Sequence, residues 1–263
     1  MALIKYKDIF QKHYLASFDE PCIPLGFLDT VKWLPLSENI LLVGGADIGR
    51  TSYLKSGVFH LISQYRPNDI CLWLYDGGLC TFNDFSRFRI PHIKFACCKG
   101  DYNQEEHLID TLYEEVTTRQ TLLADTCKYT SFAEHKKHTG IGLAPKGIVL
   151  LNFGENFFRR LCDLPPQYVQ KFSEIVRFSN ALDICVVLCI QDYASFFWGY
   201  GINEQNFPRK VAIIRSNNYD QDGVSAPVSL LSTDYPPPWC SPICLSQVEL
   251  QEQLSKIFLP KQV

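Results

Sequence analysis

The chain has 263 residues, of which 46% are hydrophobic and 20% are charged, so it is long and apolar enough to bury a large core. Its net charge of -3 gives no global attraction for nucleic acid or for an anionic membrane. Eleven cysteines without a signal-peptide pattern at the start indicate reduced thiols in a cytosolic chain, and no apolar segment approaches the roughly 20 residues that span a bilayer.

Strands and helices are expected to alternate along the chain. Residues 1–38 form a lead-in, with an amphipathic helix at its start and an extended part whose prolines disfavour helix. The elements expected beyond it are, in order, a strand at 39–44, a helix over about 50–64, a strand at 70–76, a loop, a helix over about 104–126, a polar stretch at 128–140, a strand at 147–153, a helix at 166–182, a strand at 183–191, strands at 210–216 and 228–232, and a terminal helix at about 246–258. This order predicts an α/β fold in one domain, 1–263, with a mostly parallel central sheet flanked by helices.

The cysteines and histidines do not form a metal-binding pattern. Cys185 and Cys189 lie inside the apolar run "DICVVLCIQ", where buried small side chains are expected. The spacings of the remaining cysteines and of His135 and His138 do not match a zinc site. No metal site is therefore expected.

The stretch "NILLVGGADIGRTSYL" at 39–54 has the pattern of a phosphate-binding loop. Gly44, Gly49, Arg50 and Thr51 match G-x-x-x-x-G-K-[ST] at every position except the lysine. Glycines let backbone N–H groups converge on an anion, the helix N-terminus adds its dipole, and the threonine hydroxyl holds Mg²⁺. Because the match follows a strand and opens a helix, we interpret it as a phosphate loop; an ordinary glycine-rich turn is the alternative.

Two residues indicate that this loop no longer binds nucleotide. Arg50 replaces the compact ammonium of lysine with a bulky planar guanidinium. Asp47 places a carboxylate where a triphosphate would sit, and each such repulsion is on the order of 3 to 4 kcal/mol. We expect Asp47 to pair with Arg50, so that the loop is closed by its own carboxylate.

The residues that would hold Mg²⁺ and orient water are altered as well. P-loop enzymes need a later strand that ends in Asp, usually followed by Glu. Here the corresponding strand ends in Asn152 and Phe153, and Glu155 is a candidate substitute two residues farther on. Asp76, at the end of another strand, is either a catalytic acid or a turn residue beside Gly77. The sequence therefore predicts a degenerate site with no catalytic residue.

Segments on both sides of this loop match the order and spacing of a known family. They are "IPLGFLD" at 23–29, "LWLYDGGLCTFNDFSRFRIPHI" at 72–93, "EEVTTRQTLL" at 114–123 and "LDICVVLCIQD" at 182–192, with Gln191 at the family's polar sensor position. Together, from about residue 21 to about residue 235, they resemble the FtsK/SpoIIIE-type motor ATPases. Within that family they resemble the tandem ATPase modules of the type VII secretion coupling proteins, EssC/EccC.

This resemblance implies a RecA-like P-loop NTPase fold. Arg50, the pair Asn152 and Phe153, and Asp192 depart from the pattern of the motors, so the chain is similar to the degenerate C-terminal module of that family. The resemblance also implies a cytoplasmic domain of a membrane-anchored bacterial protein. Its implied partners are helical-hairpin (WXG100-like) secretion substrates, adjacent ATPase modules of the same polypeptide, and other copies of the chain in a ring such as a hexamer.

We expect a pseudo-ATPase that acts in substrate recognition or in regulation of export, without a bound cofactor. One alternative is an ATP–Mg²⁺ hydrolase that uses Arg50, Thr51, Asn152 and Glu155, as a secretion motor or a DNA translocase. Another alternative is ATP binding without turnover. No nucleic-acid partner is expected, because the sequence shows no strongly basic balance. The aromatic stretch at 193–201 is either a partner anchor or part of the core.

Overall fold

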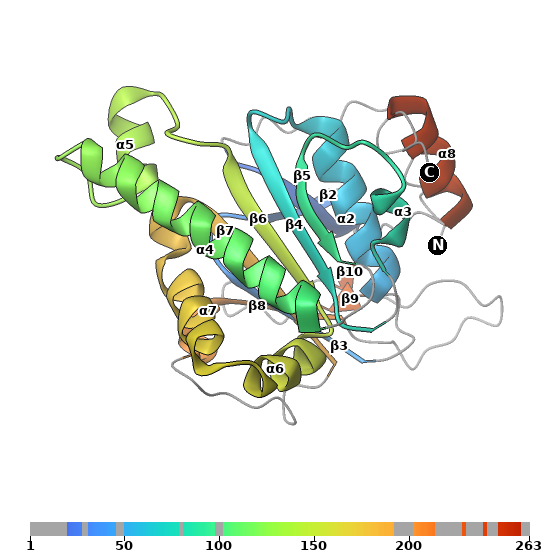
Figure 1. Cartoon of the computed structure of the whole chain (residues 1–263). Coiled ribbons are helices and arrows are strands. Elements are labelled where there is room, and N and C mark those ends of the chain that lie inside the picture. The colour runs from blue at the N-terminus through green and yellow to red at the C-terminus, as the bar shows by residue number, and fades with distance from the viewer. Residues whose placement is uncertain are drawn as a thin grey trace.

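The computed structural model describes residues 20–27, 31–45, 50–78, 81–97, 102–191, 202–213, 228–229, 239–240 and 247–258. At their centre lies a six-stranded sheet in which every neighbouring pair of strands runs parallel (Figure 1). The strand order is β5-β4-β6-β7-β3-β8, with bounds β3 (Ile40–Gly44), β4 (Ile70–Asp76), β5 (Ile93–Cys97), β6 (Lys146–Asn152), β7 (Ile184–Ile190) and β8 (Arg209–Ile213). The expected α/β fold with a parallel central sheet is confirmed.

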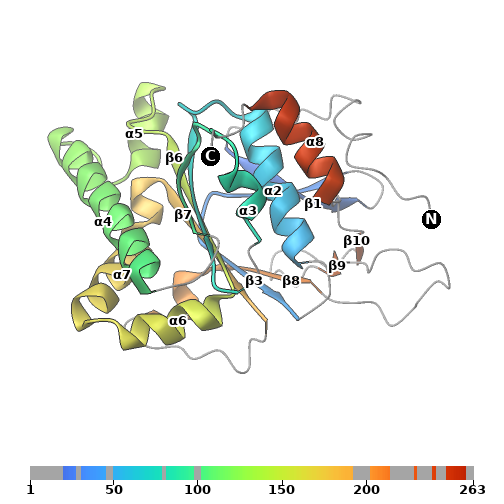
Figure 2. The same ribbon diagram turned by 45° about the vertical axis from the view of Figure 1, so that its right-hand side comes forward.

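Helices cover both faces of this sheet, as Figures 1 and 2 show. The helices on one face are α2 (Arg50–Gln64), α3 (Asn83–Ser86) and α8 (Gln247–Ile257), and those on the other are α4 (Tyr102–Asp125), α5 (Phe132–Thr139), α6 (Gly154–Asp163) and α7 (Pro166–Phe178). All seven residues of β4, β6 and β7 are buried, because their side chains alternate between the two helical layers. This burial explains why these strands are apolar runs without a polar face.

Smaller elements lie beside the central sheet. Strands β1 (Cys22–Phe27) and β2 (Val31–Pro35) form an antiparallel hairpin that packs on α2, and β9 (Val228–Ser229) pairs antiparallel with β10 (Trp239–Cys240). Two 3-10 turns, η1 (Asn180–Leu182) and η2 (Glu204–Asn206), complete the description. The helix expected near the N-terminus and the aromatic stretch at 193–201 lie outside the described residues. Within the part of the chain that the structure describes, no helix combines the length and the apolar character that crossing a membrane requires.

Several elements differ from the sequence-based expectation. The structure places α3 and β5 in the segment between residues 77 and 101 that was expected to be a loop, and α6 follows β6 directly. The polar stretch at 128–140 contains α5. This short helix is stabilised at its start by the Ser131 hydroxyl, which accepts a hydrogen bond from the Glu134 N–H (3.1 Å), and it ends at Gly140, which has a φ of 74°.

Strand β7 contains two thiols inside the core. Cys185 and Cys189 are fully buried, which confirms the expectation that they are small core side chains. Burial raises the pKa of both thiols to about 12, because the core does not solvate a thiolate. These two cysteines are therefore protonated and unreactive at neutral pH.

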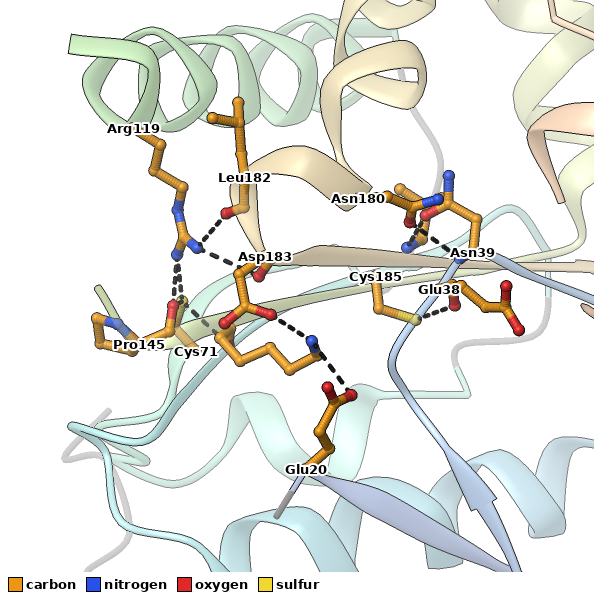
Figure 3. A network of polar contacts seen from close by, with 12 residues as sticks. Glu20, Glu38, Asn39, Cys71, Arg119, Pro145, Asn180, Leu182, Asp183 and Cys185 are labelled. Atoms are coloured by element: carbon orange, nitrogen blue, oxygen red, sulfur yellow. Dashed lines mark hydrogen bonds and ion pairs between the residues drawn. The ribbon is translucent and has the colours of Figure 1, made fainter. Parts of the chain in front are cut away.

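A buried guanidinium joins α4 to the amino ends of the strands (Figure 3). The Arg119 side chain has no exposed surface. It donates hydrogen bonds to the carbonyls of Leu182 (2.9 Å) and Pro145 (2.6 Å) and forms an ion pair with Glu115 (2.7 Å). Arg119 thus supplies hydrogen bonds to carbonyl groups just before β6 and β7.

A second polar residue at this edge, Asn39, fixes the start of β3. Its amide nitrogen donates to the Ser179 hydroxyl (2.8 Å), and its amide oxygen accepts from the Val186 N–H (2.8 Å). Asn39 thereby joins β3 to β7 and to the end of α7. The amino edge of the sheet is consequently a stabilising edge, filled with satisfied polar side chains.

Replacing Arg119 with alanine is expected to lower the free energy of unfolding by about 3 kcal/mol, because it leaves buried carbonyls without donors. Urea denaturation of the purified protein measures the change. Gln120→Ala, on the exposed side of the same helix, is the matched control and should change stability by less than about 0.5 kcal/mol. Equal stability of the two variants would show that the Arg119 network is dispensable.

His60 should make the fold sensitive to acid. It packs against Trp33, with 5.2 Å between ring centroids, and burial lowers the pKa of its imidazole from 6.5 to about 4. Because the unfolded chain binds this proton more readily, the stabilisation is complete above pH 6.5 and is lost as the pH falls toward 4. We expect the free energy of unfolding to fall by about 2 kcal/mol between pH 7 and pH 5 from this group alone.

Denaturation of the natural chain and of His60→Phe at both pH values isolates this effect. Phenylalanine keeps a ring beside Trp33 but does not titrate, and His92, whose pKa is also lowered by burial, is present in both proteins. The natural chain should lose more stability than the variant on acidification. An equal loss in the two proteins would contradict the assignment to His60.

Candidate functional site

The carboxyl ends of the parallel strands meet at one edge of the sheet, where α2 and α6 begin (Figure 2). Gly44 ends β3, Asp76 ends β4 and Asn152 ends β6, and Asp76 pairs directly with Asn152 in the strand register. Gln191 follows the last residue of β7. Open α/β sheets bind ligands outside the carboxyl ends of their strands, so this edge is the candidate site.

The phosphate loop joins β3 to α2 at this edge. Gly44 and Arg50 are described, whereas Asp47 and Gly49 lie outside the described residues, and so does the expected pairing of Asp47 with Arg50. Thr51 is the second residue of α2, and its side chain is partly exposed. The strand, loop and helix order that the motif requires is therefore present.

Arg50 points into the protein. Only 4% of the residue is exposed, its Nη1 donates to the Gly44 carbonyl (2.8 Å), and its guanidinium lies 4.4 Å from the centroid of the Phe153 ring. A lysine that binds phosphate at this position extends toward the ligand instead. The cationic group of Arg50 is thus engaged by a carbonyl and an aromatic ring of its own chain, a contact worth up to about 2 kcal/mol when the pair is desolvated.

Asn152, at the position of the acidic strand end, serves the turn after β4. The residue is fully buried, and its Nδ2 donates to the Thr81 hydroxyl (2.8 Å) and to Asp76 Oδ1 (3.5 Å). Asp76 in turn accepts hydrogen bonds from the N–H groups of Gly78 (3.1 Å) and Thr81. Asp76 is therefore engaged in the turn that follows β4, as the turn interpretation predicts, and Asn152 supplies it with a neutral donor.

A second carboxylate at position 152 would not fit this arrangement. It would lie beside the buried Asp76 carboxylate, where two negative charges repel each other and one of them must take up a proton. An amide has the same shape and donates a hydrogen bond instead. An asparagine at this strand end is therefore compatible with the buried Asp76, whereas a second ionised carboxylate is not.

Phe153 lies between the turn after β4 and Arg50, the first residue of α2. Its backbone is left-handed, with φ 56° and ψ 56°, which is uncommon for a bulky residue. A Cβ on Gly77 would lie 2.9 Å from the Phe153 carbonyl oxygen, and a Cβ on Gly78 would lie 3.4 Å from the ring. Gly77 thus allows the Phe153 backbone to approach, whereas a Cβ on Gly78 would be in ordinary contact with the ring. The Phe153 side chain has no group that polarises water.

Glu155 and Gln191 form a separate contact at the same edge. The Glu155 carboxylate accepts a hydrogen bond from the backbone N–H of Gln191, so the first turn of α6 is tied to the end of β7. Asn156, one residue later, donates to the Gly77 carbonyl (2.9 Å). Glu155 is thereby engaged in joining strand ends, and the Gln191 side chain is exposed.

The structure brings Gly44, Arg50, Asn152 and Phe153 together, as the motif predicts. Thr81 and Asn156 also hold this edge and were missed in the sequence, because nothing in their spacing signals contacts that form only through the strand register. Among the described residues, no group of three or more His, Cys, Asp and Glu side chains is placed to hold a metal ion.

Comparisons with known proteins show what the chain resembles. No protein-family model matches it. The type VII secretion system protein EssC of Staphylococcus aureus (strain NCTC 8325 / PS 47) is 26% identical over 123 residues, which are 46% of this chain and 8% of EssC. The match thus covers less than a tenth of the length of that relative.

Solved structures extend the likeness to most of the chain. The cytoplasmic domain of the type VII secretion ATPase EccC of Thermomonospora curvata has a TM-score of 0.69 at 16% identity, over 94% of this chain and 32% of that chain. ATPases 2 and 3 of the same EccC, in complex with a signal sequence peptide, give a TM-score of 0.63 at 14% identity, over 89% and 45% of the two chains. The resemblance expected from the sequence is thereby confirmed: in sequence and in its P-loop ATPase fold, the chain is similar to the ATPase modules of EssC and EccC.

Proposed function

We propose that this chain is a non-hydrolysing ATPase-type module of a type VII secretion coupling protein, which acts in substrate recognition or in regulation of export. The main observation in support of this proposal is that the Arg50 side chain points into the protein. The residue at the lysine position contacts Gly44 and Phe153 of its own chain, so its charge is not presented to a nucleotide.

The acidic strand end supports the same conclusion. Hydrolysis needs a carboxylate that holds the Mg²⁺ shell and a base or polar group that orients water. Asn152 donates to Asp76 and Thr81, Phe153 is apolar, and Glu155 accepts from the Gln191 backbone. None of these described side chains is arranged for the two roles.

The proposed partners follow from the similar proteins. One of them, EccC, was solved with its ATPases 2 and 3 and a signal sequence peptide. By analogy, we propose that this module contacts adjacent ATPase modules of the same polypeptide and the signal segments of helical-hairpin (WXG100-like) substrates, in a ring of copies facing the cytoplasm and anchored to the membrane by another part of the protein. At 14% identity, the similarity to EccC supports these partners by analogy only. Experiments on the site of this chain must test them.

ATP binding without turnover is the second candidate. Gly45, which ends the described part of this segment, is exposed, and nothing lies within 4 Å of a Cβ placed on it. The N-terminus of this 15-residue helix and the partly exposed Thr51 are favourable for an anion. This second candidate function differs from the first only in that ATP binds at the carboxyl edge of the sheet.

Calorimetric titration of ATP with Mg²⁺ into the natural chain should show no saturable heat at micromolar concentrations, and phosphate release should not exceed that of a Thr51→Ala control. Arg50 is engaged inside the protein, and no acidic pair follows β6. The double variant Asp47→Gly with Arg50→Lys tests whether residues of the phosphate loop alone prevent ATP binding. Mg²⁺-dependent release that disappears in Thr51→Ala would overturn the proposal and favour the enzyme.

Restoring the acid with Asn152→Asp should destabilise the fold rather than activate it. We expect a loss of about 3 kcal/mol at pH 7, because the new carboxylate is buried beside Asp76. The pair must bind a proton in the native state, so the loss should shrink as the pH falls toward 4. Denaturation at both pH values measures it.

The control for this variant is Asn156→Asp. Its new carboxylate also lies at this edge, in α6, but not beside the buried Asp76 carboxylate. Asn156→Asp should therefore lower the free energy of unfolding less than Asn152→Asp does. Millimolar Mg²⁺ should not restore the stability of Asn152→Asp. Full restoration by Mg²⁺ would show that the edge retains a metal site and would contradict the non-hydrolysing assignment.

A further inference from the structure

Strand β5 is the last strand on its side of the central sheet (Figure 1). One edge of β5 pairs with β4, and no described strand pairs with its other edge. An edge strand presents a row of backbone N–H and C=O groups that an added strand can bind. The outer edge of β5 is therefore a place where the backbone of a partner can extend the sheet.

A cavity of about 330 Å³ borders this strand. Ile93 and Ala96 pack on the core layer that contains α2, whereas Phe95 belongs to the layer on the opposite face of the sheet. All three residues line the cavity, so it lies along the edge of β5 and not on one face. Its other side is formed by the end of α3 and the turn that leads into β5, at residues 88–91.

The cavity combines an apolar lining with a basic rim. Phe88, Ile90 and Ile93 supply apolar surface, and none of the described residues that line the cavity is acidic. Arg89 and Lys94 also line it, and both are exposed and form no ion pair with a described residue. Because the whole chain has a net charge of -3, this positive charge is a local property of the cavity.

Lys94 also controls which strand can pair with β5. It is the extra residue of a bulge, since Leu72 and Trp73 of β4 pair with Ile93 and Phe95. A lysine and a bulge on an edge strand disfavour pairing with a neutral strand, and two β5 strands paired about a two-fold axis would bring their lysines together. A strand that carries carboxylates meets this charge favourably instead.

We propose that the outer edge of β5 and the cavity beside it form a docking site for an extended, acidic segment of a partner protein. The segment binds as an added strand of about five residues, the length of β5, with carboxylates beside Arg89 and Lys94 and an apolar side chain in the cavity. The occupant is a polypeptide, because an extended backbone has donors and acceptors at the spacing of the strand edge. No residue of the phosphate loop or of the turn after β4 takes part, so the inference is independent of nucleotide binding.

The probe is a fluorescent, capped heptapeptide of alternating glutamate and valine, and fluorescence anisotropy measures its binding to the natural chain. We expect saturable binding, and a peptide of alternating lysine and valine should bind at least about 10-fold more weakly. Two further glutamate peptides are N-methylated, one at the valines and one at the glutamates. One of these two should lose binding, because alternate residues of a strand direct their N–H groups to opposite edges.

Charge reversal tests the basic rim. The double variant Arg89→Glu with Lys94→Glu should weaken binding of the glutamate peptide by at least about 10-fold and should favour the lysine peptide. Lys128→Glu with Lys137→Glu makes the same change in net charge at exposed positions outside the cavity and should leave the affinity within about 2-fold. Circular dichroism checks that both double variants are folded.

Hydrogen exchange locates the bound peptide. Amide exchange of residues 93–97, read by mass spectrometry, should slow at least about 5-fold when the glutamate peptide saturates the natural chain. The docking site would be overturned by an absence of saturable binding, or by equal weakening in the two double variants. Unchanged affinity of both N-methylated peptides would show a general anion site without strand addition, and self-association that the peptide reverses would assign the edge to a second copy; either result also contradicts the proposal.

Discussion

A parallel sheet buried on both faces leaves only two places for polar side chains, its amino edge and its carboxyl edge. In this protein the three longest strands, β4, β6 and β7, are buried at every position, so a charged group placed among them needs partners from the protein. Arg119 and Asn39 meet this requirement at the amino edge by binding carbonyl, hydroxyl and amide groups at the strand starts. The same requirement governs the carboxyl edge, where the candidate site lies.

At the carboxyl edge, groups that would serve a ligand in an active P-loop enzyme serve the protein itself. Asp76 organises the turn that follows β4, Asn152 donates to Asp76, and Arg50 donates to Gly44 while facing Phe153. These contacts engage within the protein groups that a nucleotide or Mg²⁺ would engage in an enzyme. The non-hydrolysing function is therefore proposed from a set of mutually dependent contacts and not from one missing lysine.

The sequence correctly predicted helices and strands that contain long apolar patterns, and it failed to predict short helices. The strands at 70–76 and 183–191 and the helix over 50–64 were predicted because their periodicity spans whole elements. Helix α5 was missed because its only apolar buried residue is Phe132, and its start and end depend on Ser131 and Gly140.

The site shows the same limit. The motif placed Gly44, Arg50 and Asn152 at one edge, because parallel strands align their carboxyl ends. The inward rotation of Arg50 and the Asn152–Asp76 hydrogen bond depend on side-chain directions and strand register, which residue spacing does not encode.

The left-handed Phe153 also has an evolutionary consequence, since Asn152, Phe153 and Arg50 constrain one another. We expect an acidic residue at position 152 to lower stability before it adds any chemistry, because it would lie beside the buried Asp76, and this restricts the order in which substitutions toward catalysis can accumulate.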